Sequence, residues 1–194
     1  IALRAMRNLC LSYLAYTSLG NNIVQKHYNS ADNMTDKLAA LSAATSTALA
    51  CRDALLADFE QKWQHDGLVM DKWFALQATR PDENVLEVVN RLMDHPSFNF
   101  NNPNRLRALV GSFVNRNLKA FHKIGGSGYR FLTDILIKLN DSNPQVAARL
   151  IEPLIHFARY DAQRQTLMKR ALERLSTVED LSKDLFEKIE KALQ

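Results

Sequence analysis

Two arginines lie just inside segments that are expected to begin helices, where a guanidinium can bind an anion. Arg107 follows Pro103 by four residues, and Arg149 follows Pro144 by five. Each proline follows an asparagine, and an Asn-Pro pair begins a helix well because Asn caps the free N–H groups and Pro fits the first helical position. A cation in the first turn is disfavoured by the helix dipole by about 0.3–1 kcal/mol. The placement therefore indicates a carboxylate partner, either on an adjacent helix or on a ligand.

Other patterns that could carry chemistry are absent or incomplete. The five histidines form no His-Glu-x-x-His motif, so surface or capping roles are expected of them, the alternative being a zinc site assembled from distant histidines. The run from Gly125 to Gly128 lacks the Lys-Ser/Thr and the preceding strand of a phosphate loop, and predicts instead that Gly125 or Gly126 ends one helix and Ser127 caps the next. No nucleophile elbow, Ser/His/Asp signature or dinucleotide fingerprint occurs. The residues predict no catalytic and no metal site in this chain.

Composition is that of a globular protein with an interspersed charge pattern. Of 194 residues, 46% are hydrophobic and 24% charged, and the net charge is +4. No apolar run approaches the length of about 18 residues that a membrane span needs. A charge balance this even predicts neither a nucleic-acid nor a membrane partner. Cys10 and Cys51 are expected to be buried thiols in a reducing compartment such as the cytoplasm.

Apolar periodicity predicts helices almost throughout. Leu3, Met6, Leu9, Cys10, Tyr13 and Leu14 form an apolar stripe at helical spacing. Thr35 is expected to cap the third helix. Helices are expected over 1–18, 22–30, 36–49, 51–64, 68–79, 82–95, 103–120, 127–140, 144–158, 160–175 and 178–193. No segment alternates as a strand does, so the class is all-α.

A repeat accompanies this pattern, because the two Asn-Pro starts are 41 residues apart with one further helix between them. A period of two helices near 41 residues is typical of HEAT and armadillo arrays. The expected fold is therefore an α-α superhelix of stacked antiparallel helix pairs, the alternative being a closed bundle. Equivalent helix starts in such an array share a rim, which would bring Arg107 and Arg149 to one surface. The basic segment 159–174 is interpreted as a solvated face.

The second half of the chain resembles the C-terminal end of bacterial aminopeptidase N, a family of zinc-dependent gluzincin aminopeptidases. The resemblance rests on NPNRLRALVGSF, AFHKIGGSGYRFLTDILIKLN, NPQVAARLIEPLIHFARYDAQRQTLMKRALERL and LSKDLFEKIEKALQ. It extends over roughly 81–194, while residues 1–80 fit the same domain by pattern. It also implies that Gln194 is the native C-terminus. The zinc ligands, the catalytic glutamate and the Gly-x-Met-Glu-Asn motif of that family lie in an earlier domain, and none of these motifs occurs here.

The resemblance implies that residues 1–194 form a single helical domain that caps the active site and shapes the peptide chamber. The implied partners are the catalytic domain of the same polypeptide, which would hold the zinc, and peptide substrates. Arg107 and Arg149 match arginines that reach towards the chamber, so both are candidate substrate-binding residues, with an internal salt bridge as the alternative. For Arg105 a surface position is an equal alternative. A monomer is expected, and an exposed apolar or mixed patch is expected where the other domains would pack. The competing hypothesis is a free-standing HEAT-like protein-interaction module.

Overall fold

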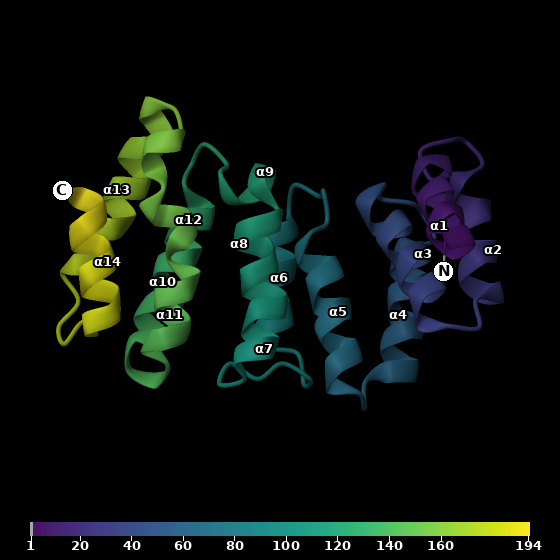
Figure 1. The fold of residues 1–194 in the computed structure, drawn as a ribbon, viewed down its shortest axis with the longest axis horizontal. Helices are drawn as coiled ribbons and strands as arrows, with labels where there is room; N and C mark the ends of the chain where they lie inside the picture. The colour runs from purple at the N-terminus through teal and green to yellow at the C-terminus, as the bar shows by residue number, and fades with distance from the viewer. Residues whose placement is uncertain (1) are drawn as a thin grey trace. The chain divides into compact units, whose positions relative to one another are not determined.

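The computed structural model describes residues 2–194, and all regular structure in that range is helical (Figure 1). The described chain divides into two compact units, residues 1–98 and residues 99–194, which we call unit 1 and unit 2. The predicted all-α class is confirmed. Each unit has its own apolar core, as expected for short amphipathic helices that must each bury one face.

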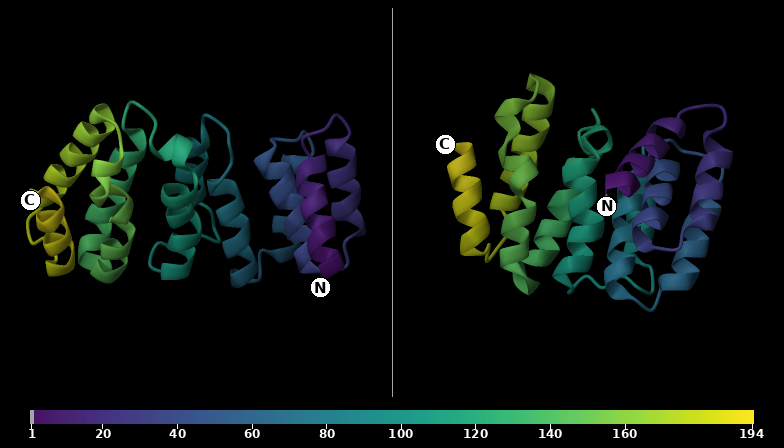
Figure 2. Two further views of the ribbon diagram at one scale, coloured as in Figure 1. Left: turned by 45° about the horizontal axis from the view of Figure 1, so that its top comes forward. Right: turned by 45° about the vertical axis from the view of Figure 1, so that its right-hand side comes forward.

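Unit 1 contains six helices, joined by short turns so that neighbours pack side by side (Figure 2). They are α1 (Ala2–Leu14), α2 (Gly20–Ser30), α3 (Met34–Ser46), α4 (Arg52–Trp63), α5 (Gly67–Ala78) and α6 (Val85–Met93). The interior is filled by large side chains from α2 to α5, namely Val24, Tyr28, Leu41, Phe59, Met70 and Phe74. These residues recur at helical spacing, so periodicity alone places them on the buried faces.

A buried carboxylate joins α1 to α3. Asp36 is 1% exposed and accepts hydrogen bonds from Arg7, from Asn8 Nδ2 at 2.9 Å and from Asn33 Nδ2 at 2.8 Å. Burial raises the pKa of this carboxyl, but the hydrogen bonds from Asn33 and Asn8 and the charge of Arg7 outweigh it, so the pKa lies below its usual range. A buried charge is tolerated only when it is paired in this way. Helix α1 is thus held by polar contacts on one face.

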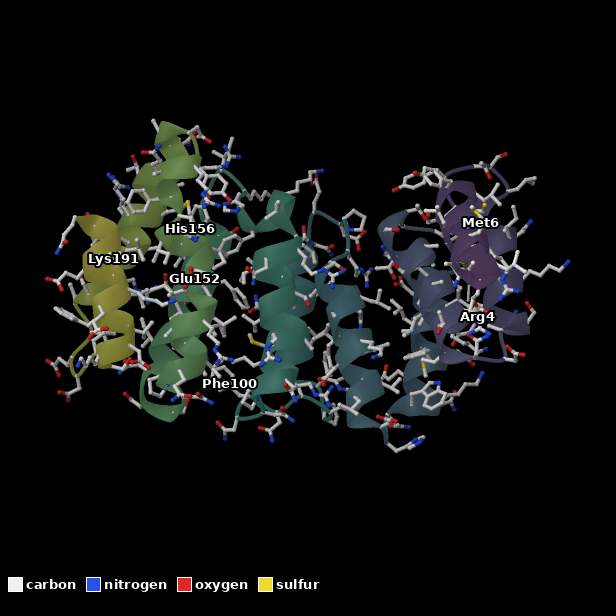
Figure 3. The ribbon with its side chains drawn as sticks, viewed as in Figure 1. Arg4, Met6, Phe100, Glu152, His156 and Lys191 are labelled. Atoms are coloured by element: carbon white, nitrogen blue, oxygen red, sulfur yellow. The ribbon has the colours of Figure 1, made fainter. Side chains whose placement is uncertain are left out.

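The opposite face of α1 is apolar and exposed to solvent. Its apolar residues are 88% exposed at Leu3, 60% at Met6, 53% at Leu9 and 71% at Tyr13. Arg4 and Met6 are labelled on this helix in Figure 3. The stripe that the spacing predicts is present, but it does not face the core of unit 1. The prediction that Cys10 is buried is wrong for this reason, whereas Cys51 is buried as expected.

Unit 2 contains the remaining helices. They are α7 (Pro103–Leu106), the π-helical turn η1 (Arg107–Gly111), α8 (Ser112–Arg116), α9 (Leu118–Phe121), α10 (Ser127–Ser142), α11 (Pro144–Leu150), α12 (Glu152–Ile155), the 3-10 turn η2 (Phe157–Arg159), α13 (Ala162–Ser176) and α14 (Lys183–Leu193). Helix α10 packs against α11 and α13, and α11 packs against α14. The core of unit 2 contains Leu106, Phe113, Phe121, Tyr129, Leu132 and Leu136.

Both Asn-Pro pairs begin helices as predicted. Asn102 accepts hydrogen bonds from the backbone N–H groups of Asn104 at 3.0 Å and Arg105 at 3.3 Å. Asn143 accepts one from the N–H of Val146 at 3.2 Å. The prolines occupy the first turn in each case. The two starts of the repeat are therefore locally equivalent.

Two other cap predictions are wrong. Asn33, rather than Thr35, caps α3, because its side chain reaches the N–H of Asp36 at 3.0 Å. Gly126 precedes α10 with a φ of +67°, a conformation that favours glycine, and Ser127 is already the first helical residue. Helix α3 therefore begins two residues earlier, and α10 one residue earlier, than the predicted caps would allow.

Two helices that the sequence predicts as continuous are interrupted. The segment 103–120 contains the π-helical turn and ends at Arg116, after which Asn117 caps α9. The segment 144–158 breaks into three pieces around Ile151. Pro153 explains the second break, because proline has no N–H to donate to the preceding turn.

Gly128 is predicted to be essential for packing within unit 2. A Cβ at this position would lie 2.3 Å from the backbone oxygen of Phe121, which cannot move without shifting the chain. We expect Gly128→Ala to lower the free energy of unfolding by about 1–3 kcal/mol, as overpacking does. Gly125→Ala is the matched control, because nothing lies within 4 Å of a Cβ there. Chemical denaturation of the two variants tests this, and equal stabilities would contradict the packing assignment.

Candidate functional site

A pocket of about 310 Å³ lies in unit 2 between the α7–η1–α8 helix and α11. Both candidate arginines, Arg107 and Arg149, line it. The complete lining consists of Pro103, Arg107, Gly111, Ser112, Asn115, Arg116, Val146, Arg149 and Leu150. The tertiary structure therefore brings together the two residues that the Asn-Pro repeat pointed to.

The helix that carries Arg107 changes its winding at this pocket. The N–H of Ser112 donates to the carbonyl oxygen of Arg107, five residues back, in place of the usual four. Turns of this kind occur mostly as single insertions in α-helices, frequently at functional sites. Asn115 Nδ2 donates to the carbonyl oxygen of Gly111 at 2.9 Å and so satisfies a backbone group next to the turn. The π turn is thus built into the wall of the pocket.

Gly111 leaves room for the stem of Arg107. A Cβ on Gly111 would lie 3.3 Å from Arg107 Cγ and 3.8 Å from Leu150 Cδ2. Any larger residue would press on the arginine side chain from the helix side. The absence of a side chain at Gly111 therefore lets the aliphatic part of Arg107 lie against the backbone of its own helix.

The pocket is strongly cationic. Arg107, Arg116 and Arg149 are exposed, and its nine lining residues include no aspartate or glutamate. Arg107 donates to the Asn104 side chain at 3.2 Å, a neutral partner. Within residues 2–194, no carboxylate forms a salt bridge with any of the three guanidiniums. The internal salt bridge considered as an alternative for Arg107 and Arg149 is therefore not present in the described chain.

The helix dipole acts differently on Arg105, Arg107 and Arg149, the three arginines that follow the Asn-Pro pairs. Arg149 lies in the last turn of the seven-residue helix α11, where the dipole favours a cation. Arg107 lies on a helix that continues to Arg116, so it remains near the positive end. Arg105 is buried, at 6% exposed, so the surface alternative for it is wrong. Arg116 and Gly111 were not singled out from the sequence, since no motif marks them.

A second polar cluster in unit 2 is buried and structural. His122 is 6% exposed, its Nδ1 lies 2.9 Å from the Tyr129 hydroxyl, and its ring stacks on Tyr160 at 4.2 Å. Arg164 Nε donates to the backbone oxygen of His122 at 2.8 Å. Burial, and then the Arg164 charge, lower the pKa of His122, while burial raises that of Tyr129 to about 12. The neutral imidazole can accept a hydrogen bond from the Tyr129 hydroxyl through Nδ1, which ties α10 to the end of α9.

Two of the other histidines have carboxylate neighbours that fit structural roles. His95 Nε2 lies 2.8 Å from Glu60, and His156 lies 3.4 Å from Glu152 one turn away on α12, as labelled in Figure 3. Among the described residues, no group of three His, Cys, Asp or Glu side chains is placed to hold a metal ion. None of the helices in the described range is both long enough and apolar enough to span a membrane.

Comparison with known proteins identifies the class of this fold. The chain belongs to the ARM-repeat family described as a domain of unknown function, DUF3458_C, whose model matches residues 1–194. This confirms the helical-repeat character predicted from the two Asn-Pro starts.

The relatives are aminopeptidases. The chain is 84% identical to aminopeptidase N of Haemophilus influenzae over 194 residues and 56% identical to that of Escherichia coli over 195 residues, in each case across 100% of this chain and 22% of the relative. A solved structure, Legionella pneumophila aminopeptidase A in complex with aspartic acid, matches with a TM-score of 0.90 and 32% identity, over 98% of this chain and 23% of that one. The chain thus spans about a fifth of the length of its curated relatives and corresponds to the C-terminal helical domain of aminopeptidase N-type enzymes.

The buried His122 predicts a loss of stability in mild acid. Its pKa in the folded chain lies below the ordinary value near 6.5, so the unfolded chain takes up the proton first as the pH falls. We expect the free energy of unfolding to decrease as the pH is lowered from 7 towards 5. Carboxyl groups with lowered pKa values, such as Asp58 and Asp82, act at lower pH, below about 4.

The measurement is the unfolding midpoint of the wild type and of His122→Gln at several pH values between 7 and 5. His27 also has a lowered pKa and contributes a slope of the same sign, so the comparison between the two proteins isolates His122. His122→Gln is expected to be less stable at pH 7 but to have a shallower slope. Parallel slopes would show that His122 does not titrate with unfolding.

Proposed function

We propose that this chain is the cap domain of a zinc aminopeptidase, in which Arg107 and Arg149 contact the bound peptide away from the scissile bond. The observation that carries the proposal is the shared pocket, in which exposed guanidiniums face no carboxylate of the described chain. A guanidinium offers a planar fork of donors that suits a peptide carboxylate or carbonyl. The identity with aminopeptidase N from three organisms supports the assignment of the reaction to hydrolysis of N-terminal residues.

The chemistry belongs to another part of the polypeptide under this proposal. A metal-activated water made in the catalytic domain would attack the first peptide bond. The present residues would act by enclosing and orienting the peptide. We place the whole enzyme in the cytoplasm as a monomer, a location that the free thiols Cys10 and Cys51 support.

The apolar stripe of α1 is the proposed contact with the catalytic domain. Leu3, Met6, Leu9 and Tyr13 are more than half exposed, although their helix is anchored to α3 through Asp36. Contiguous apolar surface of this kind marks an interaction site in a globular protein. Its occupant is taken to be the rest of the same polypeptide, because the relatives are several times longer than this chain. A free-standing interaction module would use the same stripe for an unrelated protein.

Substitution of the two arginines tests the substrate contact. We expect Arg107→Ala or Arg149→Ala in the full-length enzyme to lower kcat/KM for peptides about ten- to hundred-fold, corresponding to about 1–3 kcal/mol of lost binding in the transition state. Aminoacyl-anilides lack the distal peptide, so their turnover should fall less. The unfolding midpoint should be unchanged, because both side chains are exposed. Equal losses for peptides and anilides, or a lowered midpoint, would assign the arginines to stability.

Association in trans tests the α1 contact. We expect the 194-residue chain, shown by circular dichroism to be folded, to bind the separately expressed remainder of the enzyme. Met6→Asp should weaken this binding, because it places a charge in the centre of the apolar stripe. Ser12→Asp is the control, since Ser12 is exposed on the same helix outside the stripe. Failure of two folded pieces to associate would favour the free-standing module.

A further inference from the structure

A third arginine joins the two candidate substrate contacts. Arg116 closes α8 and lines the same pocket as Arg107 and Arg149, although 33 residues of sequence separate it from the latter. Under the function proposed above, the three arginines together indicate which part of a peptide the pocket receives.

The lining of the pocket carries a net positive charge. Three guanidiniums line a pocket of about 310 Å³ with no acidic residue among its walls. Unit charges 4 Å apart repel by about 1 kcal/mol even in water, and by more where the dielectric is lower. The neighbouring Asn115 amide is neutral and donates to the Gly111 carbonyl, so it supplies no negative charge to offset the guanidiniums. A neutral peptide carbonyl would leave the excess charge in place, whereas an anion would remove part of it.

The size and the apolar lining of the pocket limit what can bind in it. Pro103, Val146 and Leu150 add apolar surface to the lining of the pocket. The volume is at the lower end of the range for small-molecule sites, about 300–1,000 Å³. A space of this size and character fits one residue with its carboxylate rather than an extended chain. Arg–carboxylate pairs are also the strong, frequently bidentate case among charged hydrogen bonds.

We propose that this pocket binds the free C-terminal carboxylate of a short peptide substrate, with Arg116 as a specificity-determining residue beside Arg107 and Arg149. A peptide carries one such group whatever its sequence, so the site would select substrates by length and by a free terminus. The carboxylate of an acidic side chain has the same chemistry, and the experiment separates the two sources.

The test uses the full-length enzyme and a series of peptides of three to eight residues, each prepared as the free acid and as the C-terminal amide. The measured quantity is the ratio of kcat/KM for acid over amide, because a ratio within one variant cancels changes in overall activity. We expect the wild type to prefer the acid about tenfold at the lengths that reach the pocket. Arg116→Gln should bring the ratio close to one. Arg159→Gln, which removes an exposed arginine outside this pocket, should keep the wild-type ratio.

A second arm replaces the last residue of the amide peptides by Asp or Asn. Equal turnover of these two amides supports the terminal carboxylate, whereas rescue by Asp alone would overturn that assignment in favour of a side-chain carboxylate. An acid-to-amide ratio near one at every length in the wild type, or an unchanged ratio in Arg116→Gln, would also overturn it. If Arg107→Ala and Arg149→Ala still lower turnover of acids and amides alike, the function proposed above stands while this inference fails.

Discussion

The fold depends on helices that are too short to be stable alone. The longest, α10, has 16 residues, and several have four to seven, whereas isolated helices below about 12–15 residues are marginal in water. Each must therefore bury a face against its neighbours, and each unit provides such a core. Helix α1 buries only Leu11 and is also joined to α3 by the polar contacts of Asp36. The apolar stripe of α1 is exposed, with Leu3, Met6, Leu9 and Tyr13 each more than half accessible.

Periodicity and Asn-Pro pairs were sufficient to predict the all-α class and the positions of most helices. These signals are local, and the caps at Asn102 and Asn143 use residues adjacent in sequence. The failed prediction of the α3 cap concerns competition between neighbouring candidates. Asn33 and Thr35 can both cap a helix, and the choice follows from where Asp36 is buried, which the sequence does not reveal. Proline signals the break near Pro153, but the continuous apolar pattern around it led to the prediction of an unbroken helix.

Part of the candidate site was predicted from the sequence. Equivalent positions in a repeat suggested that Arg107 and Arg149 share a surface, and the pocket contains both. Arg105, in the same first turn, is instead buried, because the helix turns that face towards the core of unit 2. The net positive charge of the pocket could not be predicted, because it depends on the acidic residues being placed outside the pocket by the tertiary structure. Arg116 carries no local signal at all.

The π-helical turn at Arg107–Gly111 sets the angular phase of everything that follows it. Residues nine apart in a regular α-helix lie about 180° apart around the axis, at roughly 100° per residue. One inserted residue subtracts about 100° from that separation, which leaves Arg107 and Arg116 about 80° apart and able to line one pocket. The turn therefore lets this helix carry one extra residue while Arg107 and Arg116 keep the separation of about 80° that a spacing of eight would give in a regular α-helix. A single deletion that restored a regular α-helix would leave Arg116 on the same side as Arg107, and would change the backbone hydrogen bonding of the pocket wall rather than its charges.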